Sequence, residues 1–274
     1  MRISGETMEK DAVRIAEGIY WVGYADKHRG LHCNPYLIVE GEEAVLIDGG
    51  NRDDFSTVML KILRTGVEPA QITRLIYQHY DPDLCGSLPQ FESIINTKEL
   101  RIISHRENNV FIHYYSARTQ KLDYRDLGGY YDFATGRRLE FYGIPYCHQP
   151  GSFVTYDTQT KTLFSSDLFG SFDSRWELML ELGDACKECL NPEECPGRLG
   201  TCPLKGIVEF HRTIMTSDRA LTLALDTIET LDIERVAPQH GSVVTTKDDA
   251  AAIIRHLRAI EHVGIDSVLS GELQ

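Results

Sequence analysis

The chain lacks any apolar run long enough to cross a lipid bilayer. A helical membrane span needs roughly 20 consecutive apolar residues, and charged residues interrupt this sequence far more often than that. The opening MRISGETMEKDAVRI is charged and has no apolar core of signal-peptide length. We therefore expect no membrane partner and a cytoplasmic location.

The sequence also lacks an excess of positive charge. Its 28 Lys and Arg residues stand against 41 Asp and Glu residues, which gives a formal net charge of −13 at pH 7. Nucleic acids and anionic membrane surfaces attract basic proteins. The charge balance therefore excludes both as main partners.

No internal repeat, low-complexity tract or obvious linker divides the 274 residues. A chain of this length can bury a full hydrophobic core. We expect a single domain over residues 1–274, with a cysteine-rich insert at about 182–205.

Short apolar runs typical of strands alternate with helical patterns along the chain. Strands followed by helices, twice over, predict an α+β fold of two stacked sheets with helices outside. Strands are expected at 18–23, 35–41, 43–50, 72–78, 100–105, three times between 137 and 168, and from 233; helices are expected at 55–66, from 86, within 207–231 and at 248–264.

Side chains that can bind metals occur at four places where an apolar run ends. Three follow the run ITRLIY, and one follows each of three later runs. Each alone is typical of an ordinary loop residue or an Asx turn. Four such ends together are better explained by one shared metal site. The residues are His79, Asp81, Asp83, His148, Asp167 and His240.

This pattern resembles the metallo-β-lactamase superfamily, whose fold is an αββα sandwich. The motif HxDxD at 79–83, followed by His148, Asp167 and His240, matches the order of the superfamily's metal ligands. The acid at the second ligand position is similar to the flavodiiron proteins of this superfamily. So are the flanking segments GSLPQF, HQPGSFVTYD, LFSSDLFGSF and APQHG. The resemblance covers residues from about 19 to 244.

The resemblance implies a binuclear iron centre. One iron would be bound by His79, Asp81 and His148, and the second by Asp83 and His240. Asp167 would bridge the two ions. Three imidazoles and three carboxylates form a hard donor set that suits iron, whereas zinc hydrolases of this fold are richer in histidine. Zinc stays open as an alternative.

Two departures from the flavodiiron pattern bear on function. The family usually has histidine directly after the third ligand, but this sequence has Leu84, which leaves an open position on the second metal unless His28 or His32 fills it. Flavodiiron reductases also continue into a flavodoxin domain that holds FMN. We expect no FMN domain here, because no phosphate-binding loop follows the sandwich. The stand-alone domains that this chain resembles are oxygen-binding diiron proteins.

The resemblance therefore implies a non-haem diiron protein that binds, senses or reduces O2 or NO. One alternative is a binuclear zinc hydrolase of an ester, thioester or lactam. Another is a non-catalytic redox or O2 sensor that signals to a partner protein. The sequence leaves open whether the chain is an oxidoreductase acting on O2 or NO. It also leaves open its electron donor or signalling protein and the formation of a homodimer.

Four of the seven cysteines gather in the stretch GDACKECLNPEECPGRLGTCP: Cys186, Cys189, Cys195 and Cys202. Four thiolates this close can hold an iron–sulfur cluster or a structural zinc ion, and free thiols are the third alternative. An iron–sulfur cluster here would replace the flavin as an electron relay.

Four other residues have simpler interpretations, and of the three scattered cysteines among them Cys85 and Cys147 neighbour the ligand loops. Cys33, Cys85 and Cys147 are interpreted as small buried thiols. Asp48, in the segment LIDGG, is expected either to brace the ligand loops or to begin the turn at Gly49.

Overall fold

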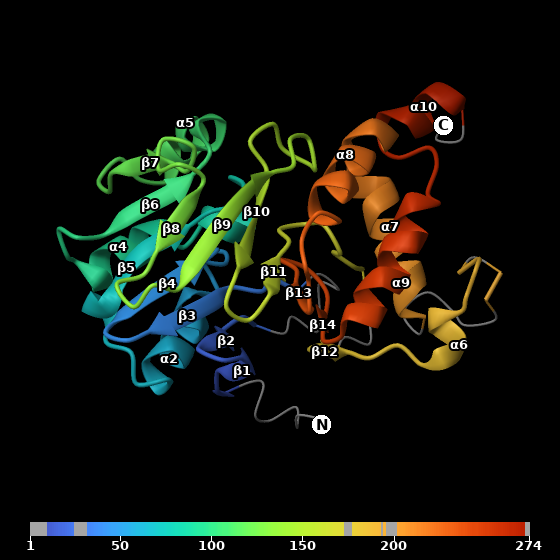
Figure 1. Cartoon of the computed structure of the whole chain (residues 1–274). Coiled ribbons are helices and arrows are strands. Elements are labelled where there is room, and N and C mark those ends of the chain that lie inside the picture. Colours follow the sequence, from blue (N-terminus) through green and yellow to red (C-terminus); the bar gives the residue numbers. More distant parts are fainter. Residues whose placement is uncertain (1–9, 25–31, 173–176, 193, 196–201, 272–274) are drawn as a thin grey trace. The chain divides into compact units, whose positions relative to one another are not determined.

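The computed structural model describes residues 10–24, 32–172, 177–192, 194–195 and 202–271. The chain forms two compact units (Figure 1). Unit 1 contains the described residues 10–24, 32–141 and 158–160, and the other described residues belong to unit 2. The expectation of a single domain with an insert stays a prediction.

Unit 1 contains a seven-stranded sheet in the order β1-β2-β3-β4-β5-β6-β7. Strands β1 to β4 pair antiparallel, and strands β4 to β7 pair parallel. Strands β8 and β9 are not part of this sheet. They pair antiparallel as a hairpin, and its residues up to 141 belong to unit 1. The strands are β1 (Val13–Ala16), β2 (Ile19–Trp21), β3 (Tyr36–Glu40), β4 (Glu43–Ile47), β5 (Ile72–Ile76), β6 (Arg101–Ser104), β7 (Lys121–Asp123), β8 (Tyr130–Asp132) and β9 (Arg138–Gly143).

The central strands of this sheet are buried on both faces, which is typical of parallel strands. Consecutive residues Val45, Leu46 and Ile47 all have exposed fractions of 1% or less. Leu46 belongs to an apolar cluster that also contains Val58 of α2 and Phe91 of α4, so these helices cover one face. The helices of unit 1 are α2 (Phe55–Arg64), the 3-10 helix η1 (Pro69–Gln71), α3 (Pro82–Cys85), α4 (Leu88–Ile95) and α5 (Arg106–Tyr115).

Unit 2 contains five strands in the order β12-β14-β13-β11-β10. The pairs β11–β13 and β12–β14 are parallel, and the pairs β10–β11 and β13–β14 are antiparallel. The strands are β10 (Phe153–Asp157), β11 (Thr162–Phe164), β12 (Met179–Leu180), β13 (Arg235–Ala237) and β14 (Val243–Val244). The helices are α6 (Asp184–Lys187), α7 (Pro203–Ile214), α8 (Asp218–Ile228), α9 (Lys247–Arg258) and α10 (Ile265–Ser270).

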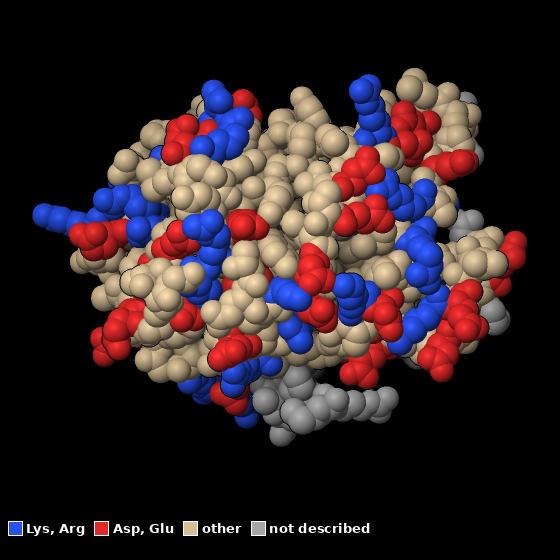
Figure 2. Space-filling model, viewed as in Figure 1, with Lys and Arg blue, Asp and Glu red and all other residues tan. Residues whose placement is uncertain are grey.

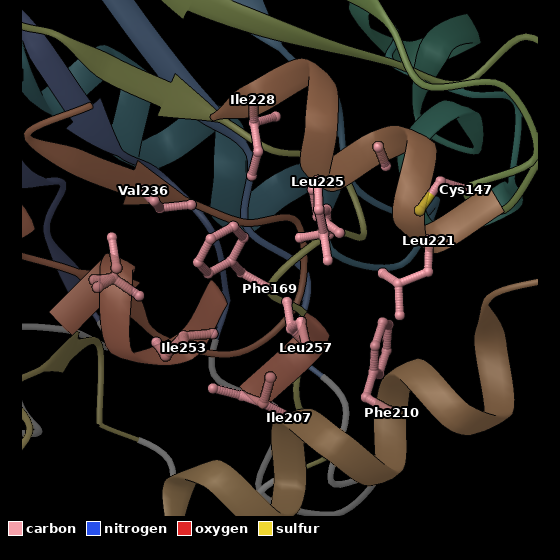
Figure 3. Packing of buried hydrophobic residues seen from close by; sticks show 14 of the residues in the cluster. Cys147, Phe169, Ile207, Phe210, Leu221, Leu225, Ile228, Val236, Ile253 and Leu257 are labelled. Atoms are coloured by element: carbon pink, nitrogen blue, oxygen red, sulfur yellow. The ribbon is translucent and has the colours of Figure 1, made fainter. Parts of the chain in front are cut away.

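The core of unit 2 forms where helices α7, α8 and α9 meet. Figure 3 shows Phe169 in the middle of apolar side chains from all three helices, among them Ile207, Leu225 and Leu257. All four side chains have exposed fractions of 3% or less. Phe169 lies two positions after the predicted ligand Asp167, so the core of this unit anchors that ligand's loop.

The surface agrees with the charge balance of the sequence. On the face shown in Figure 2, acidic and basic side chains are interspersed over the molecule. Within the described ranges, every helix falls short of the length and apolarity that a membrane span requires.

Candidate metal centre

Asp167 and His240 lie at matching positions beyond two parallel strands of unit 2. Phe164, the last residue of β11, pairs with Ala237, the last residue of β13. Asp167 and His240 each follow three residues later. Backbone hydrogen bonds continue the pairing between the two connectors, with Ser166 O accepting from Gln239 N–H at 2.8 Å. Because parallel strands in register end at the same edge, the sequence brings these two side chains together.

The carboxylate of Asp167 faces two imidazoles at once. Its Oδ2 lies 2.9 Å from Nε2 of His148, and its Oδ1 lies 3.7 Å from Nε2 of His240. The Asp167 side chain is almost fully buried. A buried carboxylate whose two oxygens face different imidazole nitrogens has the donor set and orientation to bridge two metal ions.

His148 lies in a short hydrogen-bonded connection before β10. Ile144 N–H donates to Ser152 O at 2.9 Å, and Tyr146 N–H donates to Gln149 O at 2.8 Å. The hydroxyl of Ser152 accepts from Gln149 N–H at 3.0 Å. These hydrogen bonds fix the backbone on both sides of His148. The Cα atom that carries its imidazole ring is therefore held in place.

Helix α7 supports the Asp167 loop through His211, a residue that sequence reasoning missed. His211 is fully buried, and its Nε2 accepts from Phe169 N–H at 3.1 Å while its Nδ1 lies 2.7 Å from Ile207 O. Burial lowers the pKa of His211 to about 4, so the neutral ring is the form that fits. A Cβ at Gly170 would collide with the ring of Phe210, so glycine lets the loop approach α7.

In unit 1, three buried side chains fix the backbone directly before His79. Asp48 Oδ1 accepts from Gln78 N–H at 3.1 Å, and Asn108 donates to Gln78 O at 3.4 Å. Ser104 donates to Tyr77 O at 2.5 Å. Asp48 follows β4, Ser104 ends β6 and Asn108 lies on α5. Through this hydrogen bond Asp48 braces the loop that carries His79, which is the first of the two roles expected for it.

Asp81 and Asp83 lie at the start of the one-turn helix α3. Leu84 N–H and Cys85 N–H both donate to the backbone carbonyl of Asp81, whereas the side chain of Asp81 makes no capping hydrogen bond. Its Oδ2 lies 3.8 Å from Nε2 of His79. Asp83 is in the first turn of the helix.

The oxygen Oδ2 of Asp83 accepts a hydrogen bond from the thiol of Cys33 at 3.8 Å. Cys33 is only partly buried, so its interpretation as a buried thiol was wrong. Cys85 and Cys147 are fully buried as expected, and burial raises the pKa of both thiols. Leu84 is also fully buried and belongs to the apolar cluster of unit 1.

The predicted ligands thus gather in both units. Unit 2 brings His148, Asp167 and His240 together. In unit 1, ligand atoms of His79 and Asp81 lie within 4.8 Å of each other, as do those of Cys33 and Asp83. Of the two histidines considered for the open position, His32 is buried and His28 lies outside the described residues. The set of six ligands as one centre stays a prediction.

The cysteine-rich insert is anchored to the helices of unit 2. Arg255 of α9 donates to Lys187 O at 2.8 Å, and Lys205 of α7 donates to Cys195 O at 2.8 Å. The thiols of Cys195 and Cys202 interact, and burial raises the pKa of Cys202. Among the described residues, the groups able to hold a metal include none of the four cysteines of the insert.

Solved structures with the same fold are flavodiiron proteins and their relatives. A mutant flavo di-iron protein from Thermotoga maritima matches with a TM-score of 0.75 and 21% identity, over 90% of this chain and 60% of that one. The apo chemotaxis sensor ODP from T. denticola matches with a TM-score of 0.70 and 20% identity, over 94% of this chain and 97% of the sensor. A structure described as a peroxy diiron species of the same sensor gives 0.72 at 22% identity, over 95% and 99% of the two chains.

Curated relatives agree with this fold. The anaerobic nitric oxide reductase flavorubredoxin of Aeromonas hydrophila is 24% identical over 94% of this chain and 51% of its own length. The nitric oxide reductase of Moorella thermoacetica is 24% identical over 92% of this chain and 62% of its own length. The chain therefore spans about half to two thirds of the length of these relatives.

The two sheets with their helices and the matching solved structures define a protein of the metallo-β-lactamase fold, as the sequence predicted. Within that fold, the profile of one family, described as "ODP family beta lactamase", matches residues 31–241. The chain belongs to this family.

Proposed function

We propose that this chain is a non-haem diiron protein that binds O2 or NO at a binuclear iron centre. The observation that carries the proposal is the buried Asp167 carboxylate, whose two oxygens lie 2.9 Å and 3.7 Å from two imidazole nitrogens. His148 and His240 would then each bind one of the two ions that Asp167 bridges. His79 and Asp81 would complete the first ion, and Asp83 the second.

The residues fit such a centre chemically. Three imidazoles and three carboxylates suit iron in both its oxidation states. When bound, the two irons would supply electrons to a diatomic ligand. The protein's contribution is to hold the ligands still: Asp48, Ser104 and Asn108 fix the backbone before His79.

The relatives support both an oxidoreductase and a sensor as possible roles for a diiron protein of this kind. Two curated relatives are named for nitric oxide reduction, and two solved structures that match over nearly the whole of both chains are of a chemotaxis sensor. We propose O2 or NO as the small-molecule ligand, with an electron donor or a signalling protein as the macromolecular partner. A homodimer and a cytoplasmic location belong to the same proposal.

The zinc hydrolase alternative is less well supported. Hydrolases of this fold usually carry histidine at the second ligand position, where this chain has the acid Asp81. The histidine that usually follows the third ligand is also replaced, by Leu84, which is fully buried and has no donor atom.

The test is a metal count on protein loaded with Fe(II) without oxygen, followed by exposure to O2 and, separately, to NO. We expect about two irons per chain and a new visible absorption band with either gas. Asp167→Asn should lose metal and the band. Asp232→Asn is the matched control, because Asp232 is a surface carboxylate paired with Lys161 and Lys247. Bound zinc with ester turnover, and no response to either gas, would contradict the proposal.

Two further assays distinguish an oxidoreductase from a sensor and identify what the four cysteines of the insert hold. Sustained O2 consumption with an added reductant would indicate an oxidoreductase, whereas one turnover followed by a stable spectrum would indicate a sensor. For Cys186, Cys189, Cys195 and Cys202, analysis of zinc and acid-labile sulfide separates an iron–sulfur cluster, a zinc site and free thiols. The iron–sulfur prediction rests on the cysteine spacing alone.

A further inference from the structure

Cys33 lies beside Asp83, a predicted metal ligand that is far from it in the sequence. Its Sγ lies 3.8 Å from Oδ2 of Asp83, a residue 50 positions further along the chain. The two side chains form a pair whose donor atoms are close enough to share one metal ion. Both residues are only partly buried, so an ion can reach them.

The fold holds Cys33 in this position through its backbone. Cys33 forms a β-bridge with Tyr24, and the neighbouring Asn34 accepts a buried hydrogen bond from the Trp21 indole at 2.8 Å. A Cβ at Gly23 would collide with the carbonyl oxygen of Cys33, so glycine permits the close approach.

A buried lysine supports the same segment from the helix side. Lys61 of α2 donates to Gly23 O at 2.7 Å and lies 4.0 Å from the centre of the Trp21 ring. Lys61 is almost fully buried, and burial lowers its pKa to about 8. A charged group at such a position is costly unless it is bonded, so the contacts of Lys61 tie the segment to α2.

The second proposed ion has room for a further ligand. Asp83, Asp167 and His240 would supply three donors, and the neighbouring Leu84 turns into the apolar core instead of adding a fourth. Cys85, the last residue of α3, carries a second thiol near the predicted ligands. It is fully buried and donates to His79 O at 3.6 Å, so its sulfur does not face a ligand carboxylate. Cys33 is thus the thiol whose sulfur faces a ligand carboxylate.

We propose that Cys33 binds the second metal ion as a thiolate, together with Asp83, an inference that rests on the proposed diiron function. On metal binding, Cys33 would give its thiol proton to solvent and exchange its hydrogen bond to Asp83 for a bond to the ion. Three carboxylates and one thiolate would then supply four negative charges. This charge would balance two Fe(II) ions and favour Fe(III) more than the carboxylates alone.

The first experiment needs no substitution. Native protein is treated with iodoacetamide under anaerobic conditions, with and without two equivalents of Fe(II), and alkylation at each cysteine is followed by peptide mass spectrometry. Protein unfolded in urea sets the fully reactive rate. We expect Fe(II) to slow the alkylation of Cys33 on the order of tenfold or more, as for a metal-bound thiolate. Equal rates with and without bound iron would overturn the proposal.

The second experiment compares Cys33→Ser and Cys33→Ala with Asn109→Ala as the control, because Asn109 bonds to Leu122 O and to no predicted ligand; each variant is checked for folding by circular dichroism. After oxidation to Fe(III), wild type and Asn109→Ala should show a thiolate-to-iron charge-transfer band that both Cys33 variants lack. The second equivalent of Fe(II) should bind the Cys33 variants about 10–100-fold more weakly.

The two proposals fail in different ways. If wild-type protein binds no iron, the proposed function is wrong. If wild type and both Cys33 variants bind two irons with the same spectra, the diiron function stands and the thiolate ligand is wrong.

Discussion

Replacing His211 with glutamine should make the stability of the protein less sensitive to mild acid. The imidazole of His211 is fully buried on α7, and both of its nitrogens meet backbone groups, Ile207 O and Phe169 N–H. Burial is the main cause that lowers the pKa of His211 to about 4, with a partial opposing effect from Ile207 O and Asp167. Glutamine keeps a donor and an acceptor but does not titrate in this range.

The sign of the effect follows from proton binding. Histidine in the unfolded chain has a pKa of about 6.5, so below that pH the unfolded state binds a proton that the folded state excludes. The free energy of unfolding therefore falls as the pH drops from about 6.5 towards 4. With a folded pKa of about 4, the loss between pH 7 and pH 5 amounts to about 2 kcal/mol.

The assay is urea unfolding of metal-free protein at pH 7 and at pH 5. Between these two pH values, wild type should lose about 2 kcal/mol more than His211→Gln. At pH 7 the variant should be about 1–3 kcal/mol less stable, because the amide cannot reach both backbone groups as well. The control is His113→Gln on α5, which removes an exposed imidazole and should follow wild type. Equal losses in wild type and His211→Gln would refute the reasoning.

Two further substitutions test the supports of the ligand loops. Gly170→Ala should cost about 1–3 kcal/mol in urea unfolding, because its Cβ would collide with Phe210; adding Phe210→Leu should recover part of the loss, and an unchanged midpoint in the single variant would contradict the packing argument. Asn108→Ala should weaken Fe(II) binding about 10–100-fold in competition with a chelator, because it frees the backbone of Gln78. Asn109→Ala on the same helix is its control and should leave iron affinity unchanged; a matching loss there would mean that α5 as a whole, not this hydrogen bond, supports the site.

The sequence was informative where the chain buries both faces of a strand. The run AVLI at 44–47 is continuously apolar because all four side chains are buried, and the polar residue Asp48 directly after it marks the strand end. That is why the strands before Asp48, His79 and Asp167 could be predicted. In unit 1, Asp48 and His79 follow the parallel strands β4 and β5, so the fold places both at the same edge of that sheet.

Helix α5 was missed because its buried face is partly polar. Of its ten residues only Asn108 and Ile112 are buried, and Asn108 is buried for its hydrogen bonds rather than for apolar packing. An apolar period therefore never develops in RENNVFIHYY.

Cys33 and His211 were missed for a different reason. Cys33 meets Asp83 across 50 positions, and His211 meets Phe169 across 42. Nothing local in the sequence marks either contact, since each depends on how separate elements come together in the folded unit.

The spacing of the ligands from their strands has a consequence for how this family can vary. His79, Asp167 and His240 each come three residues after the last paired residue of a strand. Adding or deleting one residue in any of these connectors would turn the ligand away, whatever its chemistry. In other members of the family, the number of residues between strand and ligand should be the first thing to compare, ahead of the identity of the residues between them.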